Sequence, residues 1–353
     1  MSRAVITKSL LTAIANAIRA KTGGSTALTP AQMAAEIAAI PAGDDGSLQA
    51  AIGLGGGTIN YYGAEIGPYA LYYAGFNNAP YSANGPVSLV APNATKIDAY
   101  ALANAKIIDL SLPAVATVGV HAFDSAYFPA QGTHIVDLPA VVRLDAESPF
   151  YSLKINNSLG NAAYQIRLAA LTDVIGANTF SYSGVVDISQ GDDQQMTKGI
   201  YLYVPELRRV TAQRAFTSCS QLRRVNLPFV TTLGASAFYG AYSITSVDVA
   251  ALRAVPSRCF YGCWQLPQID LYDVSSIGSM AFYNCQQLTK FVIHRTDGVV
   301  TLQSTDAFTK SAIETGTGYI YVPDALVDQY KTATNWVTYA NQIKPLSEYT
   351  PEV

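Results

Sequence analysis

Two stretches of the sequence, AFTSCSQLRRVNLP at residues 215–228 and AFYNCQQLTKFVIH at residues 281–294, are copies of one pattern. Each is anchored by a phenylalanine that returns every 22 residues, at Phe216, Phe238, Phe260 and Phe282. A fixed short period is the signature of a repeat architecture, in which each unit buries its apolar face only by stacking on its neighbours. The pattern therefore predicts a solenoid.

Other positions keep constant distances from each phenylalanine. Alanine or cysteine precedes it and also stands three residues after it, and apolar residues stand six, nine and eleven residues after it. Positions nine and eleven alternate with polar neighbours, which is the period of a half-buried strand. Each repeat is thus expected to add one short strand to a parallel sheet. Weaker copies upstream have irregular spacings, which predict bulged or longer coils.

The two quoted units resemble the BspA-like class of leucine-rich repeats, most clearly over residues 210–293. The resemblance implies an α+β solenoid, a leucine-rich-repeat array with a parallel β-sheet. The segment after it looks like the terminal unit that closes such arrays. Residues 319–322 are expected to form a last strand and residues 324–331 a helix. Trp336 and Tyr339 would then cover the core of the final coil.

The start of the chain does not share the repeat. Two short amphipathic helices are expected there, the second beginning with a Thr-x-x-Gln capping box at Thr29. Such a helical hairpin is too small to fold alone. We assign attachment or oligomerisation to its apolar face, with packing on the first coil as an N-terminal cap as the alternative. That face consists of Leu10, Ile14, Ile18, Met33 and Ile37.

Residues 9–37, SLLTAIANAIRAKTGGSTALTPAQMAAEI, closely resemble a short module at the start of many tail-associated and host-interaction proteins of phages. The resemblance implies a place in the virion, with other tail or baseplate proteins as partners and a homo-oligomeric state. The domain division expected from all these features is a helical attachment or oligomerisation module, a Gly/Tyr-rich linker and entry region, the repeat array and a C-terminal cap, at residues 1–42, 43–95, 96–318 and 319–353.

Composition indicates a large folded chain: of 353 residues, 50% are apolar and only 13% are charged. The net charge of -3 and the scattered basic residues argue against nucleic acid and anionic lipid as partners. The first apolar stretch is interrupted by Asn16 and Arg19, so a secretory signal is not expected. No run reaches the ~18 apolar residues that span a membrane.

The sequence shows no catalytic constellation. His121, His134 and His294 lie in different units, and no serine occupies a Gly-x-Ser-x-Gly turn. We expect no enzyme activity, no cofactor and no metal site. Three of the four cysteines share one repeat position, which predicts buried free thiols in a packing column, with a disulfide as the alternative.

The outward positions of the predicted strands carry polar residues. We expect the aspartates to form one acidic row along the sheet, which includes Asp187 upstream. Hydrogen-bonding and aromatic side chains are expected on either side of this row. Such a surface suits a carbohydrate or protein ligand on a host cell, and the alternative is a row that is simply solvated. The candidate ligand-binding residues are Arg224, Asn226, Asp248, Gln268, Asp270, Tyr272, Lys290 and His294.

These features together predict a phage tail fibre or baseplate protein that recognises the host envelope through the exposed face of the array. Two other interpretations stay open. One is a purely structural component of the tail or neck, and the other is a bacterial cell-surface adhesin.

Overall fold

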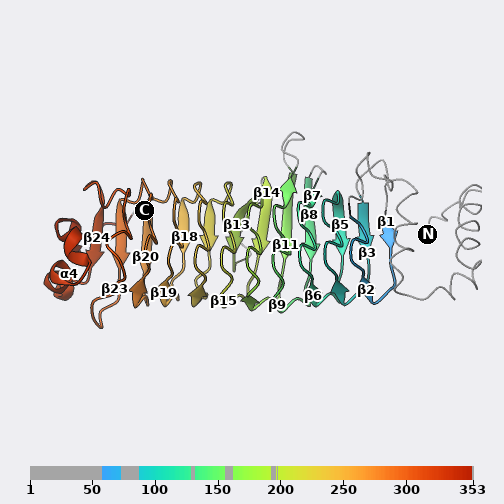
Figure 1. Cartoon of the computed structure of the whole chain (residues 1–353), viewed down its shortest axis with the longest axis horizontal. Helices are drawn as coiled ribbons and strands as arrows, with labels where there is room; N and C mark the ends of the chain where they lie inside the picture. The colour runs from blue at the N-terminus through green and yellow to red at the C-terminus, as the bar shows by residue number, and fades with distance from the viewer. Residues whose placement is uncertain are drawn as a thin grey trace, which may run out of the picture.

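The computed structural model describes residues 58–72, 87–128, 132–155, 162–191, 196 and 198–351. In these ranges the chain winds into successive coils that stack along one long axis, from β1 at one end to α4 at the other (Figure 1). All pairings between the described strands are parallel, as in β16 with β18 and β20 with β22. The predicted repeat-rich parallel β fold with few helices is confirmed.

Most coils contribute one strand to a wide wall. A nine-stranded sheet forms most of this wall, and its spatial order is β1 (Thr58–Asn60), β3 (Val87–Val90), β5 (Ile107–Ser111), β8 (Gly132–Asp137), β11 (Ala162–Arg167), β14 (Gly199–Tyr203), β13 (Val185–Ser189), β16 (Arg224–Asn226) and β18 (Ser246–Asp248). A four-stranded sheet continues it with β20 (Gln268–Leu271), β22 (Lys290–Ile293), β24 (Tyr319–Val322) and β25 (Ile343–Pro345).

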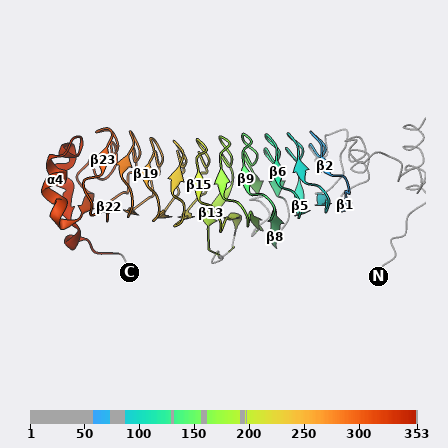
Figure 2. The ribbon, with the colours of Figure 1, turned by 90° about the horizontal axis from the view of Figure 1, so that it is seen from below.

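A second, narrow wall is built from two-residue strands in three short sheets. They are β2 (Glu65–Ile66), β4 (Lys96–Ile97) and β6 (Thr117–Val118), then β9 (Arg143–Leu144), β12 (Asp173–Val174), β15 (Arg209–Val210) and β17 (Thr232–Leu233), then β19 (Ala254–Val255), β21 (Ser276–Ile277) and β23 (Thr301–Leu302). A separate pair joins β7 (Tyr127–Phe128) to β10 (Lys154–Ile155). Figure 2 shows the coils edge-on.

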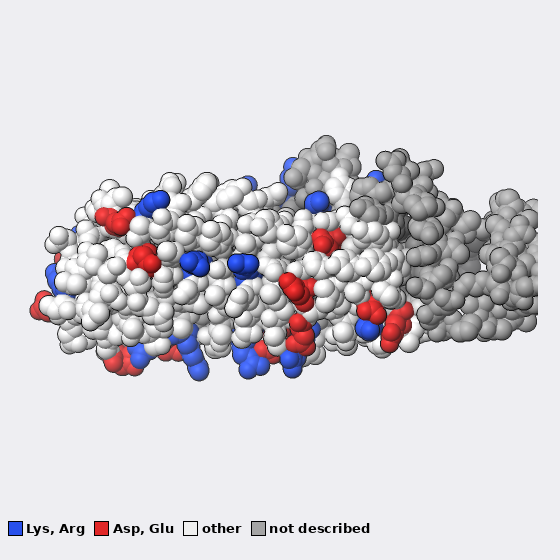
Figure 3. All heavy atoms as spheres, viewed as in Figure 1, with Lys and Arg blue, Asp and Glu red and all other residues white. Residues whose placement is uncertain are grey.

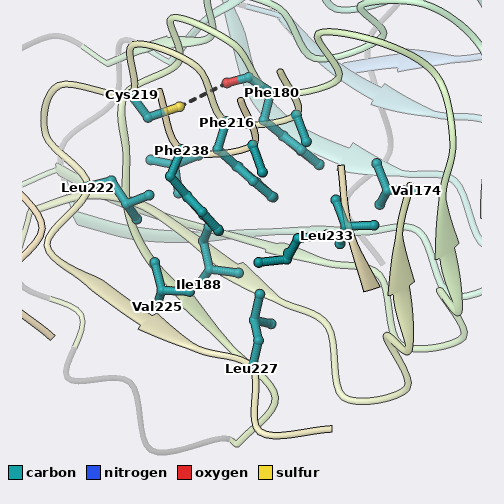
Figure 4. Packing of buried hydrophobic residues seen from close by; sticks show 14 of the residues in the cluster. Val174, Phe180, Ile188, Phe216, Cys219, Leu222, Val225, Leu227, Leu233 and Phe238 are labelled. Atoms are coloured by element: carbon teal, nitrogen blue, oxygen red, sulfur yellow. Dashed lines mark hydrogen bonds between the residues drawn. The ribbon is translucent and has the colours of Figure 1, made fainter. Parts of the chain in front are cut away.

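The repeated phenylalanines form a continuous column inside the stack (Figure 4). The rings of Phe216, Phe238, Phe260 and Phe282 are fully buried, and neighbouring ring centroids are 5.4 Å apart at interplanar angles of 10° or less. Offset stacking of this kind adds to the free energy of burial. Phe308 extends the column at 5.6 Å. The repeat that the sequence showed is therefore one interior aromatic column.

The column also runs upstream, beyond the strict period. Phe180, Phe150 and Phe123 continue it with ring centroids 5.0 to 5.3 Å apart. Leu102 and Leu71 then take the same place, since their backbone N–H groups donate to the next coil as those of the phenylalanines do. A pattern built on phenylalanine does not reveal these two leucines. Inserted residues lengthen the loops and leave the core position unchanged.

The turn around each phenylalanine uses an unusual backbone. From Phe123 to Phe282, the residues two before and two after the phenylalanine have positive φ, for example Arg214 (56°) and Ser218 (56°) around Phe216. Alternating right- and left-handed residues point the N–H groups of positions -2, 0 and +2 along the stack axis. Accordingly Arg214, Phe216 and Ser218 all donate to carbonyls of the next coil, at 2.7 to 3.0 Å. The turn thus pairs its backbone as a strand would.

One coil contains an additional strand. The chain leaves β13, passes through a segment that lies partly outside the described residues, and returns as β14, which inserts between β11 and β13. This is the interval between Phe180 and Phe216, the longest spacing among the upstream copies. The expected longer coil is therefore an inserted strand that widens the array locally.

The region expected to be the linker and entry to the array contains strands. Strands β1, β2 and β3 fall within residues 43–95, where β1 pairs with β3, and β3 pairs with β5. Glycine- and tyrosine-rich composition hid these strands, because their apolar positions are few and interrupted.

The cysteines are buried and free. The Sγ atoms of Cys219, Cys263 and Cys285 donate to the carbonyl oxygen of the phenylalanine one coil earlier, at 3.0, 3.5 and 3.1 Å. Burial raises the pKa of Cys219 to about 11, so this thiol stays protonated at neutral pH. The free-thiol interpretation is confirmed for the four cysteines, and three of them also satisfy backbone acceptors.

The last coil is followed by a compact helical segment, made of η2 (Asp324–Leu326), α4 (Val327–Thr332), η3 (Trp336–Gln342) and η4 (Leu346–Glu348). Tyr339 contacts the ring of Phe308 edge-on at 5.3 Å, and Trp336 lies 6.2 Å from the same ring. The Trp336 indole N–H donates to the carbonyl of Val300 at 2.6 Å. The expected helix at residues 324–331 starts as a 3-10 turn and becomes α-helical only at Val327.

We predict that Phe238→Ala lowers the free energy of unfolding by about 3–5 kcal/mol, because it opens a cavity between two stacked rings. Chemical denaturation followed by circular dichroism measures this. Phe229→Ala is the matched control, since the side chain of Phe229 is 58% exposed, and it should change stability by less than about 0.5 kcal/mol. Equal losses in both variants would contradict an energetic role of the column.

Asp173 is expected to stabilise the fold to a degree that depends on pH. A side-chain hydrogen bond from the Arg209 guanidinium in the adjacent strand, at 2.5 Å, holds the pKa of this largely buried carboxyl below its usual value. A carboxyl whose pKa is lower in the folded state stabilises the fold at any pH above its unfolded-state pKa. This stabilisation is lost as the pH falls through the folded-state pKa.

Asp173→Asn should therefore cost about 1 kcal/mol at pH 7. The difference from the unaltered protein should shrink once the pH falls below about 4. Urea unfolding at a series of pH values tests this. The control is Asp145→Asn, whose ion pair with Arg143 is more than half exposed on both sides and should contribute little. A deficit that persists at low pH would show that the effect is not electrostatic.

Candidate functional site

The outward face of the wide wall holds the predicted ligand-binding residues. In β20 the side chains alternate, with Ile269 and Leu271 in the core and Gln268 and Asp270 half-buried on the outside. In β22 Lys290 is in register with Gln268. The strand period thus places these polar side chains on one face, and the parallel register brings those of adjacent strands together.

Asp270 is the centre of a hydrogen-bonded cluster on this face. Its Oδ1 lies 2.9 Å from Nε2 of His294, and its Oδ2 accepts from the Gln268 side-chain amide at 2.6 Å. His294 and Asp270 are each about a quarter exposed. The cluster joins the end of β22 to the middle of β20, so two successive coils hold one carboxylate in a fixed orientation.

Tyr272 completes the cluster with an aromatic surface. Its ring stacks on the imidazole of His294 with centroids 4.2 Å apart and an interplanar angle of 5°. Half of the Tyr272 residue is exposed. Burial, and then the negative charges of Asp270 and Asp248, raise the pKa of the phenol, so the hydroxyl remains a donor at neutral pH. Tyr272, His294 and Asp270 are called the wall cluster below.

The other candidates on the wall bond to neighbouring strands. Arg224 donates to Oδ2 of Asp187 at 2.7 Å, and the amide of Asn226 donates to the Ser189 hydroxyl at 3.2 Å. The exposed carboxylate of Asp248 accepts from its own loop, from the N–H of Ala250 at 3.1 Å.

The expectation of one continuous acidic row is wrong. Asp187 is in register with Arg224, not with Asn226, and Ser189 takes the place expected for a carboxylate. Beyond Asp270 the next outward residue is Val292. The register between β13 and β16 thus places Asp187 two positions away from the row that contains Asn226. On the face shown in Figure 3, acidic and basic side chains are scattered and both signs occur.

The chain's own C-terminal segment engages two further candidates. The Tyr349 hydroxyl accepts from the Gln268 amide at 2.5 Å, and Lys290 Nζ donates to the carbonyl of Thr350 at 3.4 Å. Val292 is fully buried, although its register with Asp270 places it on the outward face of the sheet. Gln268 and Lys290 are therefore contacts within the chain. These contacts cannot be predicted from the sequence, because residues 346–351 contain no repeat that reveals where they fold.

The remaining exposed part of the site consists of Tyr272, His294 and Asp248. It offers a ring face, a carboxylate and an imidazole side by side, which suits a ligand with hydroxyl groups and apolar ring surfaces. Among the residues that the structure describes, no group of three or more histidine, cysteine or acidic side chains is arranged to hold a metal ion. No helix in the described ranges is long and apolar enough to cross a bilayer.

The attachment residues Leu10, Ile14, Ile18, Met33 and Ile37 lie outside the described residues. Their assignment therefore stays a prediction.

Comparison with known proteins identifies the repeat. Residues 201–314 match the BspA type leucine rich repeat region in six copies. This part of the chain is thus similar to repeats of that type. No curated protein matches the chain.

Three solved structures resemble the chain. A leucine-rich repeat protein from Bacteroides ovatus is 15% identical, with 82% of this chain and 83% of that chain covered and a TM-score of 0.32. The pneumococcal vaccine antigen PcpA is 12% identical, with 83% and 87% covered and a TM-score of 0.33. A leucine rich cell surface protein from Faecalibacterium prausnitzii is 16% identical, with 81% and 90% covered and a TM-score of 0.32.

Tyr349→Ala should lower the free energy of unfolding by about 1–2 kcal/mol, because it removes one hydrogen bond and one aromatic contact. The hydrogen bond is to Gln268, and the contact is with the ring of Tyr321 at 5.3 Å. Urea denaturation measures the loss. Tyr349→Phe keeps the ring and should lose only the hydroxyl contribution, so the two variants should differ. Unchanged stability in both would mean that the segment is not held on the wall.

Proposed function

We propose that the chain is a receptor-binding protein of a phage tail, and that it recognises a host cell envelope through the outward face of its wide wall. The observation that carries the proposal is the wall cluster, where the ring of Tyr272 is held half exposed by stacking on His294. Orienting the ring in advance lowers the entropy that a ligand must overcome on binding.

The array suits recognition because it is a rigid platform. As a solenoid, it would present a long row of strands, and the helical segment at residues 324–348 would act as its C-terminal cap by covering Phe308. Parallel strands lie about 4.8 Å apart. Side chains of successive coils can therefore contact successive parts of an extended ligand such as a host surface carbohydrate or a protein segment.

The phage setting is supported by the resemblance of residues 9–37 to a phage module. In that setting the N-terminal helices would attach the chain to other tail or baseplate proteins, or to further copies of itself. A bacterial adhesin with the same repeats is the second candidate, and the match of residues 201–314 to the BspA type fits both.

We propose binding and not catalysis as the activity. The carboxylate of Asp270 is held by Gln268 and His294 on the outward face of the wall. The same geometry serves well to accept hydrogen bonds from ligand hydroxyls.

Binding of the fluorescently labelled chain to a panel of Gram-positive and gut bacterial cells tests the proposal. We expect strain-selective binding, and we expect the double variant Asp248→Ala, Tyr272→Ala to weaken it about tenfold or more, since an aromatic anchor and a hydrogen-bond acceptor are lost. Phe229→Ala removes a similarly exposed aromatic side chain elsewhere and should bind normally.

The outcomes separate the candidates. Binding to no strain would contradict receptor recognition and would favour a structural tail component. Binding that survives in the double variant would place the site away from the wall cluster. Detection of the chain in purified phage particles, compared with bacterial surface fractions, distinguishes the phage protein from the adhesin.

A further inference from the structure

A groove of about 690 Å³ lies on the turn side of the coils, away from the wide wall. It is formed by the residues that flank the buried phenylalanines, whose side chains point outward because the phenylalanine between them points inward. Its lining includes Tyr239, Tyr261, Arg214, Arg258, Ser218 and Ser236. None of the residues that line it is acidic.

Tyrosines form an ordered ladder along this groove. The ring of Tyr261 stacks between those of Tyr239 and Tyr283, with centroids 4.5 and 4.7 Å apart and interplanar angles of 10° and 5°. Both faces of the Tyr261 ring are therefore covered, and at this residue a ligand can reach the ring edge and the hydroxyl group. Burial raises the pKa of Tyr261, which keeps its hydroxyl a donor at neutral pH.

Two arginines give the groove its charge. Arg214 and Arg258 are exposed and stand two coils apart, with Ser236 at the equivalent position between them. None of the ion pairs between described residues involves either arginine. Arg209 and Arg224, by contrast, each bind an aspartate on a neighbouring strand.

The backbone does not require arginine at these positions. From Phe123 to Phe282, the residue two before each column phenylalanine has positive φ, and Asn178, Ser236 and Met280 fill the same place. A left-handed residue is least strained as glycine or asparagine. The turn therefore does not need the long cationic side chains of Arg214 and Arg258, and both are available to an anionic ligand.

We propose that the turn-side groove binds an acidic polysaccharide that carries carboxylate groups. The planar guanidinium pairs with a carboxylate through two parallel hydrogen bonds. Two coils separate the arginines by about 10 Å at the usual strand spacing. That distance suits the carboxylates of alternate sugar residues in an extended chain, whose intervening hydroxyls meet Ser218, Ser236 and the tyrosine hydroxyls.

A single-stranded nucleic acid fits the groove less well. Proteins that bind it expose aromatic ring faces on which bases stack. Here both faces of Tyr261 and one face of Tyr239 are covered by their neighbours in the ladder. Sugar hydroxyls and carboxylates need only the edges, the hydroxyl groups and the arginines.

The test uses the full chain and three polyuronates, namely oligomers of polygalacturonate, alginate and hyaluronate, in calorimetric titrations at low and physiological salt. We expect binding of at least one that weakens with salt. The double variant Arg214→Gln, Arg258→Gln should reduce affinity about tenfold or more, since each charge-assisted hydrogen bond contributes at about that level.

The matched control is Arg223→Gln, Arg253→Gln, which removes the same charge from exposed residues outside the groove and should change affinity less than about twofold. Equal weakening in both pairs would show unspecific attraction and overturn the proposal, as would absence of binding to all three polyuronates. Binding of the oligonucleotide poly(dT) that is lost only in the Arg214 and Arg258 variant would assign the groove to nucleic acid instead.

Discussion

The stacked phenylalanine column is the constraint on which the rest of the structure depends. A single coil has too little apolar surface to be stable alone, and the column gives every coil the same contact with the next. Because the rings lie 5.0 to 5.6 Å apart from Phe123 to Phe308, the coils are in register along most of the described array. Leu71 and Leu102 show that volume at this position matters more than aromaticity.

Around that column, each backbone group needs a partner in the next coil. The wide and narrow walls provide it through strand pairing, and the turns provide it through alternating right- and left-handed residues such as Arg214 and Ser218. Three cysteine side chains also pair with the backbone of a neighbouring coil, since each thiol donates to the phenylalanine carbonyl one coil earlier. Because these contacts complete the interior, the outward side chains on the wall and on the turns are not needed for packing, and these are the two surfaces for which we propose ligand binding.

The outward positions of Gln268 and Asp270 could be predicted because alternation along a strand is a local property. Their partners could not. The contact of Asp270 with His294 depends on the register between coils, and the contacts of Gln268 and Lys290 with residues 349 and 350 depend on a C-terminal segment that folds back over two strands. The wall site is consequently smaller than the sequence indicated, and it is centred on Tyr272.

The sequence by itself determined the repeat, the parallel strands and the burial of the phenylalanine and cysteine columns, because a 22-residue period and a strand alternation act over short distances. Only the tertiary structure decided where the upstream aspartates lie, that β14 inserts between β11 and β13, and that Tyr239, Tyr261 and Tyr283 form a ladder beside two arginines. The physical reason is that these arrangements join residues from different coils. Their relative positions follow from loop lengths and stacking register, which no single repeat contains.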